Sequence, residues 1–225
     1  ICNSRFTKRF IDEEYGISSE VVYPPVDTEK FKPGKKENLI LSVSRFSKTL
    51  HAKKQEILIN AFGNLVKKGL KEWRLVLAGG VRDDEKDYLE SLNQKAKNLP
   101  IEFYPNLDFY KLQKLYGEAK IFWHAAGFGE EDANPERMEH FGTVVVEAMA
   151  AGCVPVVIGK GGIPEIVEDK VNGFLWEKQP DLEKLTLDLI RSSDVLDDLS
   201  QKAVVRSKKF NQQVFCQKIY EAVRE

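Results

Sequence analysis

From residue 39 onward, short apolar runs rich in β-branched residues alternate with stretches whose apolar residues recur at helical spacing. Such alternation is typical of a parallel sheet with helices on both faces, because each parallel strand needs a crossover before the next. We therefore predict a Rossmann-like, doubly wound α/β fold. About six strands are expected, at 39–43, 75–78, 101–104, 121–123, 153–158 and 174–176. Helical patterns lie between them at 57–65, 88–96, 109–116 and 142–151, with a short helix starting at Pro164.

The first 34 residues follow a different pattern. Tyr23–Asp27 is stiff and extended because it contains two prolines, and Pro33–Gly34 marks a turn. The chain starts at Ile1 rather than at a methionine, which we interpret as a cut inside a longer protein. Three segments are expected: 1–34, the end of a preceding acceptor domain plus a linker; 35–205, the α/β domain; and 206–225, a C-terminal helix.

Charge and cysteine content narrow the functional classes. The 34 basic and 35 acidic side chains leave a net charge of −1, so no general field favours nucleic acid. The longest apolar run, 144–158, is interrupted by Glu147, Gly152 and Pro155 and is too short to span a membrane. Three widely spaced cysteines show no metal or redox spacing, so we expect no metal and a reducing, cytoplasmic setting. Two basic clusters favour solvated faces, with a peripheral contact at the inner face of a membrane as the alternative: Arg5/Lys8/Arg9 and Lys67/Lys68/Lys71.

The most informative motif is residues 139–152, which read EHFGTVVVEAMAAG. Gly142 allows close approach of a ligand to the backbone, and a helix starting there presents free N–H groups that suit a diphosphate. Glu147, one turn inside that helix, can accept hydrogen bonds from a vicinal diol such as a ribose. Glu139 lies at the mouth of the same site. Singly, each glutamate has an ordinary explanation as a helix-dipole partner or a solvated loop residue; their spacing favours a binding site.

This segment resembles the retaining glycosyltransferases of GT-B architecture, specifically the large fourth sequence family (group 1 type). That family is marked by a glutamate, seven residues and a second glutamate that opens an EAMAAG-like helix. The linker 22–33 is similar to its interdomain connection, and 161–165 with 172–175 match its closing elements.

Arg45 and Lys53 resemble the family's "GR…KG" element, with Lys54 as the alternative lysine. The sequence departs from this pattern where Ser44 and Lys54 replace glycines. The loop 125–138 is also longer and more acidic than is common; we expect it to be solvated, and no ligand spacing supports a cation site there.

The resemblance implies that the chain is the C-terminal, donor-binding half of a GT-B enzyme. The parent would transfer a hexose, with mannose and glucose as candidates, from a nucleoside diphosphate sugar (UDP, GDP or ADP type) with retention of configuration. It would need no cofactor or metal. The saccharide or lipid-linked acceptor would bind mainly through the N-terminal domain, so this chain alone should bind nucleotide without turnover.

The resemblance also implies roles for individual residues. Catalysis would involve Glu139, which contacts the donor sugar, and the cations Arg45 and Lys53, which hold the diphosphate. Donor binding would further involve Glu147 at the ribose, Phe141, Gly142 and Thr143 at the diphosphate, and Asn106 and Leu107 at the base. His124 and His140 are expected to have core or supporting roles, not to act as general bases.

Three other functions compete with this interpretation. A nicotinamide-binding domain would use Gly159–Pro164, but this segment follows the fifth strand and lacks the last glycine. A nucleotide-sugar epimerase would have the same architecture. A binding module without catalysis is the third, and the presence of Glu139, Glu147 and Arg45 argues against a decayed site.

Overall fold

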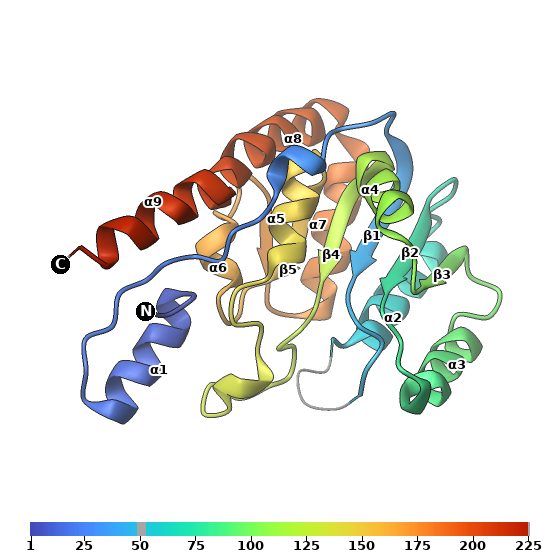
Figure 1. The fold of residues 1–225 in the computed structure, drawn as a ribbon. Helices are drawn as coiled ribbons and strands as arrows, with labels where there is room; N and C mark the ends of the chain where they lie inside the picture. Colours follow the sequence, from blue (N-terminus) through green and yellow to red (C-terminus); the bar gives the residue numbers. More distant parts are fainter. Residues whose placement is uncertain (49–52, 225) are drawn as a thin grey trace.

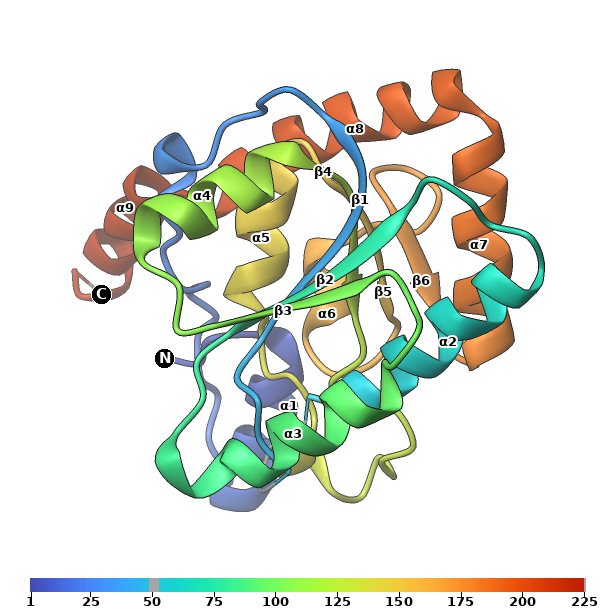
Figure 2. The ribbon, with the colours of Figure 1, turned by 90° about the vertical axis from the view of Figure 1, so that its right-hand side faces the viewer.

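The computed structural model describes residues 1–48 and 53–224. In these ranges six strands, all paired in parallel, form one sheet in the order β3-β2-β1-β4-β5-β6 (Figures 1 and 2). The strands are β1 (Glu37–Val43), β2 (Arg74–Gly79), β3 (Ile101–Pro105), β4 (Ala119–His124), β5 (Val154–Ile158) and β6 (Phe174–Trp176). The predicted parallel sheet of about six strands is confirmed.

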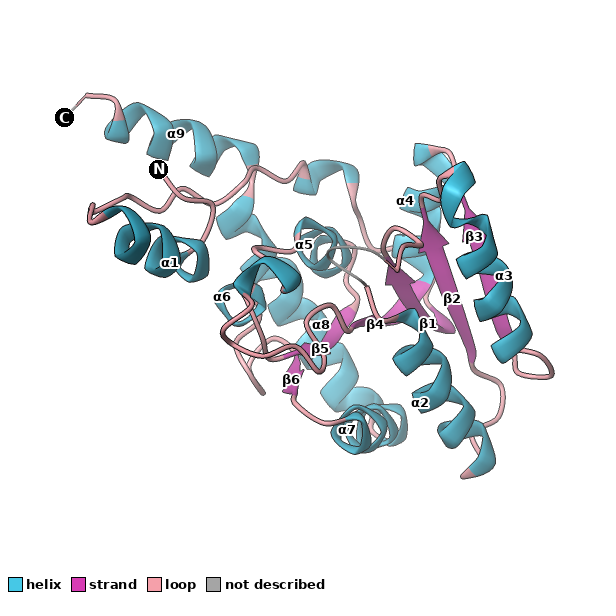
Figure 3. Ribbon diagram, turned by 90° about the horizontal axis from the view of Figure 1, so that it is seen from below, coloured by secondary structure: helices cyan, strands magenta, loops and turns pink. Residues whose placement is uncertain are grey.

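Helices cover both faces of this sheet, as predicted (Figure 3). The α-helices are α1 (Arg5–Tyr15), α2 (Gln55–Lys67), α3 (Lys86–Lys95), α4 (Phe109–Glu118), α5 (Thr143–Ala150), α6 (Ile163–Ile166), α7 (Gln179–Arg191), α8 (Ser193–Ser207) and α9 (Gln212–Ala222). Short 3-10 turns lie at Thr28–Lys30, Asp83–Glu85, Pro135–Arg137 and Lys208–Phe210.

The alternation of side chains along β1 shows how the two faces are filled. Leu39 and Leu41 belong to the apolar cluster that includes α4 and α5, whereas Ile40 belongs to the cluster that includes α2, α3 and α7. All three side chains are fully buried. A strand covered on both faces needs apolar residues in succession, which explains the unbroken run that marks it in the sequence.

The order of the strands identifies one position in the sheet as special. The chain first builds outward from β1 to β2 and β3, and then returns to place β4 on the other side of β1. The connections that leave β1 and β4 therefore run in opposite directions, which makes this pair of strands the switch point of the sheet. In open parallel sheets, ligands bind at the carboxyl ends of the strands at such a switch point.

Both ends of the chain lie beside the sheet rather than in it (Figure 1). Residues 1–34 contain α1 and an extended segment whose Val26 and Phe31 are buried in the α4/α5 cluster. The C-terminal helix expected from residue 206 starts later than predicted. The chain makes a 3-10 turn after α8 ends at Ser207, and the side chain of Asn211 caps α9 by accepting from the Val214 N–H at 2.8 Å.

Candidate functional site

The candidate site lies at the carboxyl edge of the sheet, where the segments after β1, β4 and β5 meet. Lys53, which precedes α2, contacts Glu139 in the loop between β4 and α5. The backbone of Glu139 is in turn bonded to Gly162, which follows β5. Arg45 and Lys53 lie on either side of residues 49–52, which are outside the described part of the chain.

Close backbone packing fixes the segment that carries Arg45. Gly79 has φ +152°, and a Cβ atom there would lie 1.9 Å from the carbonyl oxygen of Ser44, so only glycine fits. The buried side chain of Gln55 donates hydrogen bonds to the Ser44 hydroxyl (3.0 Å) and to the Arg45 carbonyl (2.8 Å). These contacts hold the backbone at the end of β1 and leave the Arg45 side chain exposed.

Three side chains from separate segments meet at one carboxylate. Lys53 Nζ lies 2.7 Å from Glu139 Oε2, and His124 Nε2 lies 3.4 Å from the same oxygen. The three side chains are mostly buried, with 14%, 19% and 3% of their surfaces exposed for Lys53, Glu139 and His124. Burial by itself raises the pKa of the Glu139 carboxyl, but the contacts with His124 and Lys53 outweigh it and hold that pKa well below its usual range.

A pair of glycines supports the backbone of Glu139. The N–H of Gly162 donates to the Glu139 carbonyl oxygen at 2.8 Å. A Cβ atom on Gly161 would lie 2.2 Å from that oxygen, and one on Gly162 would lie 2.2 Å from the His140 carbonyl oxygen. Gly161 also has φ +64°, which disfavours other residues. The Gly-Gly sequence after β5 therefore has a definite structural reason, which is to let the loop before α5 approach.

The start of α5 offers backbone N–H groups at this edge. Gly142 is its N-cap with φ +103°, and no side chain caps the helix. The first N–H groups of α5 thus have no side-chain acceptor, and Thr143 is exposed beside them. The side chain of Phe141 does not face this edge in a way that would let it contact a donor. Its ring is buried against Tyr23 and Phe210, so only its backbone is placed to contribute.

Glu147 and Asn106 already have partners in the structure. Glu147, one turn into α5, accepts a hydrogen bond from the Tyr116 hydroxyl at 2.8 Å, and burial raises the pKa of its carboxyl. The Asn106 side chain accepts from the N–H of Val81 at 3.0 Å and so links the ends of β2 and β3. Leu107 is partly buried next to it. Both residues lie beyond β3, which β2 separates from the Glu139 cluster.

A comparison with known proteins shows which family the chain belongs to. A model of the family described as Glycosyl transferases group 1 matches residues 25–205. The chain belongs to the glycosyl transferases group 1 family. The comparisons give no support to the nicotinamide-binding or epimerase alternatives.

Individual relatives agree with this family. The chain is 28% identical over 222 residues to a GDP-Man:Man(3)GlcNAc(2)-PP-Dol alpha-1,2-mannosyltransferase of Dictyostelium discoideum, and this match covers 90% of the chain and 41% of the relative. It is 30% identical to an uncharacterised glycosyltransferase of Methanocaldococcus jannaschii, covering 94% of the chain and 55% of the relative. The chain thus spans about half or less of these relatives.

Solved structures share the fold. HepE of Anabaena in complex with UDP and glucose superimposes with a TM-score of 0.81 at 22% identity, covering 100% of the chain and 62% of HepE. The C-terminal domain of a group 1 glycosyl transferase from Francisella tularensis gives a TM-score of 0.65 at 23% identity and covers 83% of the chain and 99% of that domain. These likenesses establish that this group 1 chain has the fold of one part of a GT-B protein.

The acidic loop of this family member is less solvated than the sequence suggested. Glu130 has only 14% of its side chain exposed and pairs with Lys54 at 2.6 Å and with Arg137 at 3.7 Å. The hydrogen bond from Lys54 is the main reason that the pKa of Glu130 is lowered. Lys160 also donates to the Glu130 carbonyl oxygen. Our expectation of a solvated loop is wrong for Glu130. It holds for its exposed neighbours Glu131, Asp132 and Glu136.

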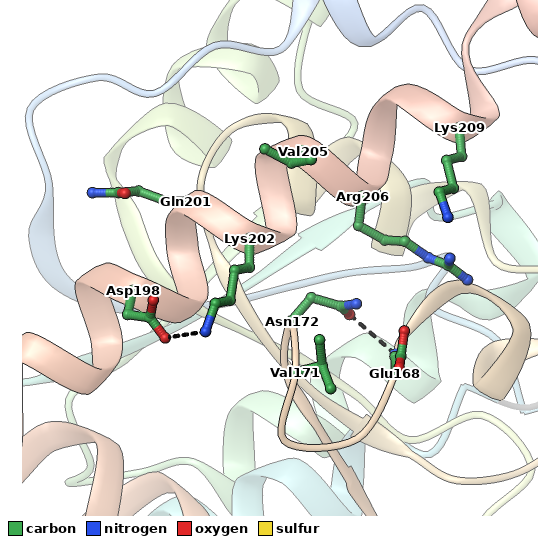
Figure 4. A pocket seen from close by; sticks show the side chains of 9 residues that line it. All are labelled: Glu168, Val171, Asn172, Asp198, Gln201, Lys202, Val205, Arg206 and Lys209. Atoms are coloured by element: carbon green, nitrogen blue, oxygen red, sulfur yellow. Dashed lines mark hydrogen bonds and ion pairs between the residues drawn. The ribbon is translucent and has the colours of Figure 1, made fainter.

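A hollow in the surface lies away from this edge. It is formed between the segment leading into the amino end of β6 and the helix α8 (Figure 4). Two of its charged side chains pair with each other, Lys202 with Asp198 at 2.6 Å, and the backbone N–H of Glu168 donates to the Asn172 side chain. Within residues 1–48 and 53–224, no acidic, histidine and cysteine side chains cluster as a metal site would require. No helix in the same ranges is long and apolar enough to cross a membrane.

We expect the stability of the chain to fall more steeply in acid than that of a Glu139→Gln variant. The pKa of Glu139 is lowered in the folded state, so the ionised carboxylate contributes stability above its unfolded pKa of about 4.3 and loses it as the pH falls towards the folded pKa. Urea unfolding of both proteins between about pH 7 and about pH 3.5 measures the difference. Parallel stability curves would show that the carboxylate is not held in this way.

Proposed function

We propose that this chain binds the nucleoside diphosphate sugar from which the whole protein transfers a sugar to an acceptor. Membership of a glycosyl transferase family supports this proposal. The observation that carries it is the grouping of Lys53, Glu139 and the uncapped start of α5 at the carboxyl edge, beside the switch point between β1 and β4. A cation, a helix N-terminus and a carboxylate there fit a diphosphate joined to a sugar.

Arg45, Lys53 and the backbone N–H groups of 141–143 would hold the two phosphates. In the reaction, the bond between the anomeric carbon and the β-phosphate oxygen breaks, and its electron pair stays on the phosphate. The acceptor hydroxyl oxygen bonds to the anomeric carbon, and its proton is taken up by the departing diphosphate. Negative charge therefore grows on the β-phosphate, where guanidinium, ammonium and helix N–H groups stabilise it more in the transition state than in the bound donor.

The two carboxylates would bind different parts of the rest of the donor. Glu139 would contact the donor sugar, on which positive charge develops as the bond to phosphate breaks. Glu147, one turn into α5, would accept hydrogen bonds from the ribose hydroxyls. Asn106 and Leu107, beyond β3, would border the base.

The relatives support a proposal for the class of donor and acceptor. GDP-Man mannosyltransferases and HepE with UDP and glucose favour a hexose on GDP or UDP. A saccharide or lipid-linked acceptor would bind largely outside this chain, which covers 41% of the Dictyostelium relative. Retention of configuration and a cytoplasmic location remain part of the proposal. So does the prediction that the chain alone binds nucleotide without turnover.

Adjacent lysines provide a matched test of the phosphate site. We expect Lys53→Met to weaken binding of GDP or UDP, because it removes a charge placed at the start of α2 beside Glu139. A hydrogen bond between charged groups is worth roughly 1.5–3 kcal/mol, so the loss should be about tenfold to a hundredfold by calorimetry.

Lys54→Met is the control for this experiment. It removes the same charge one residue away, but that charge is already paired with Glu130, so affinity should stay close to that of the wild type. The proposal fails if the wild type binds neither nucleotide, or if the two variants lose the same affinity.

Variants of Glu147 and Glu139 should differ in their affinity for the nucleoside diphosphate in the same assay. Glu147→Ala should weaken nucleoside diphosphate binding about tenfold to a hundredfold, because the ribose is present in every nucleotide. Glu139→Gln should leave that affinity undiminished, because its partner is the sugar, and should lower turnover in the whole protein. The opposite pattern would mean that the two roles are exchanged.

Transfer by the whole protein should survive chelation. Arg45, Lys53 and the start of α5 would supply the positive charge that a divalent ion otherwise brings to the phosphates. Activity measured in EDTA should therefore equal activity measured without it. Loss of transfer in EDTA that added manganese restores would refute this part of the proposal.

A further inference from the structure

We propose that His124 is the positioning residue of Glu139. Its Nε2 holds the Glu139 carboxylate in place once the Lys53 ammonium group has turned from that carboxylate to the phosphates of the donor. This inference rests on the proposed function, in which Glu139 contacts the donor sugar and Lys53 the diphosphate.

His124 is itself firmly placed. It is the last residue of β4, a central strand of the sheet, and is only 3% exposed. The preceding residue, Trp123, is fully buried, and its indole N–H donates to the Thr186 hydroxyl on α7 at 3.0 Å. A histidine that follows such an anchor has little freedom to move, which suits a group whose task is to fix another side chain.

The imidazole has no other partner in the described part of the chain. Neither Nδ1 nor Nε2 makes a hydrogen bond of good geometry there, although both atoms are buried. Buried polar atoms without partners are costly and uncommon in folded proteins. The polar group within reach of Nε2 is Oε2 of Glu139 at 3.4 Å, which needs only a small movement of the carboxylate to become a hydrogen bond.

The same carboxylate oxygen is shared with Lys53, and this sharing gives His124 its task. Lys53 Nζ lies 2.7 Å from Glu139 Oε2. A diphosphate carries more negative charge than one carboxylate and competes for this ammonium group. When Lys53 turns to the phosphates, Glu139 is left mostly buried without its cation, which is unfavourable for an ionised group. His124 is the remaining contact that can keep the carboxylate oriented.

This role is distinct from acid–base catalysis. A ring that is 3% exposed and lies behind Glu139 is not placed to exchange protons with an acceptor. His124 therefore acts on the donor sugar only through Glu139. Its removal should affect the sugar-dependent part of donor binding and leave the nucleotide part intact.

Two amide variants distinguish the ring nitrogens. In His124→Gln the side-chain amide nitrogen is separated from Cα by the same number of bonds as Nε2 of histidine. In His124→Asn the amide nitrogen is separated from Cα by the same number of bonds as Nδ1. The measured quantity is the ratio of the affinity for a nucleotide sugar to the affinity for its nucleotide, GDP-mannose to GDP or UDP-glucose to UDP. We expect His124→Asn to lower this ratio by about tenfold, because one hydrogen bond to a charged group is lost. His124→Gln should keep this ratio within about twofold of the wild type. Calorimetry on the chain provides both affinities.

The outcomes separate this inference from the proposed function. Loss of the ratio in His124→Asn with retention in His124→Gln supports it. An unchanged ratio in both variants overturns it, as does an equal fall in nucleotide and nucleotide-sugar affinity, which would indicate a purely structural role. Failure of the wild type to bind GDP or UDP at all would instead overturn the proposed function, and this inference with it.

Discussion

Glu139 is a mostly buried carboxylate, and the need to compensate its charge organises the carboxyl edge of the sheet. An ionised group withdrawn from water is unfavourable unless other charges and hydrogen bonds replace the solvent. Lys53 from the start of α2 and His124 from the end of β4 both approach the same oxygen. Three segments distant in sequence are thus held together at one atom, and the candidate donor site is built around it.

Close contacts between backbones make this convergence possible. The loop before α5 approaches the turn after β5 so closely that a Cβ atom on Gly161 or Gly162 would collide with a carbonyl oxygen. Gly79 makes a similar contact with Ser44 at the end of β1. In both places a glycine removes a side chain where two loops must touch. The backbones of Glu139 and Arg45 therefore lie in closely packed turns, and the sheet beneath these turns sets their positions.

Two features by which the sequence departs from the pattern that it resembles are joined in the structure. Lys54 stands where the resemblance implies a glycine, and the loop 125–138 is longer and more acidic than the resemblance implies. In the structure Lys54 pairs with Glu130 of that loop, next to the pair formed by Lys53 and Glu139. Lys160 also binds the backbone of the loop. The loop is thereby attached to the start of α2 beside the candidate site.

The sequence by itself determined the class of fold, because the period of apolar residues decides which faces of strands and helices are buried. It also singled out Glu139 and Glu147 through their spacing around a glycine turn and a helix start, and Arg45 and Lys53 through the resemblance of their segment to a known family. It did not indicate that the ring of Phe141 belongs to the core.

Only the tertiary structure decided which side chains meet between loops. Glu130 and Lys54 are 76 residues apart, and Lys53, which follows β1, reaches Glu139, which follows β4, because β4 returns beside β1. Local patterns specify the elements and their buried faces. Contacts between loops depend on the order of the strands and on the packing of several crossovers at once, and no local pattern encodes this.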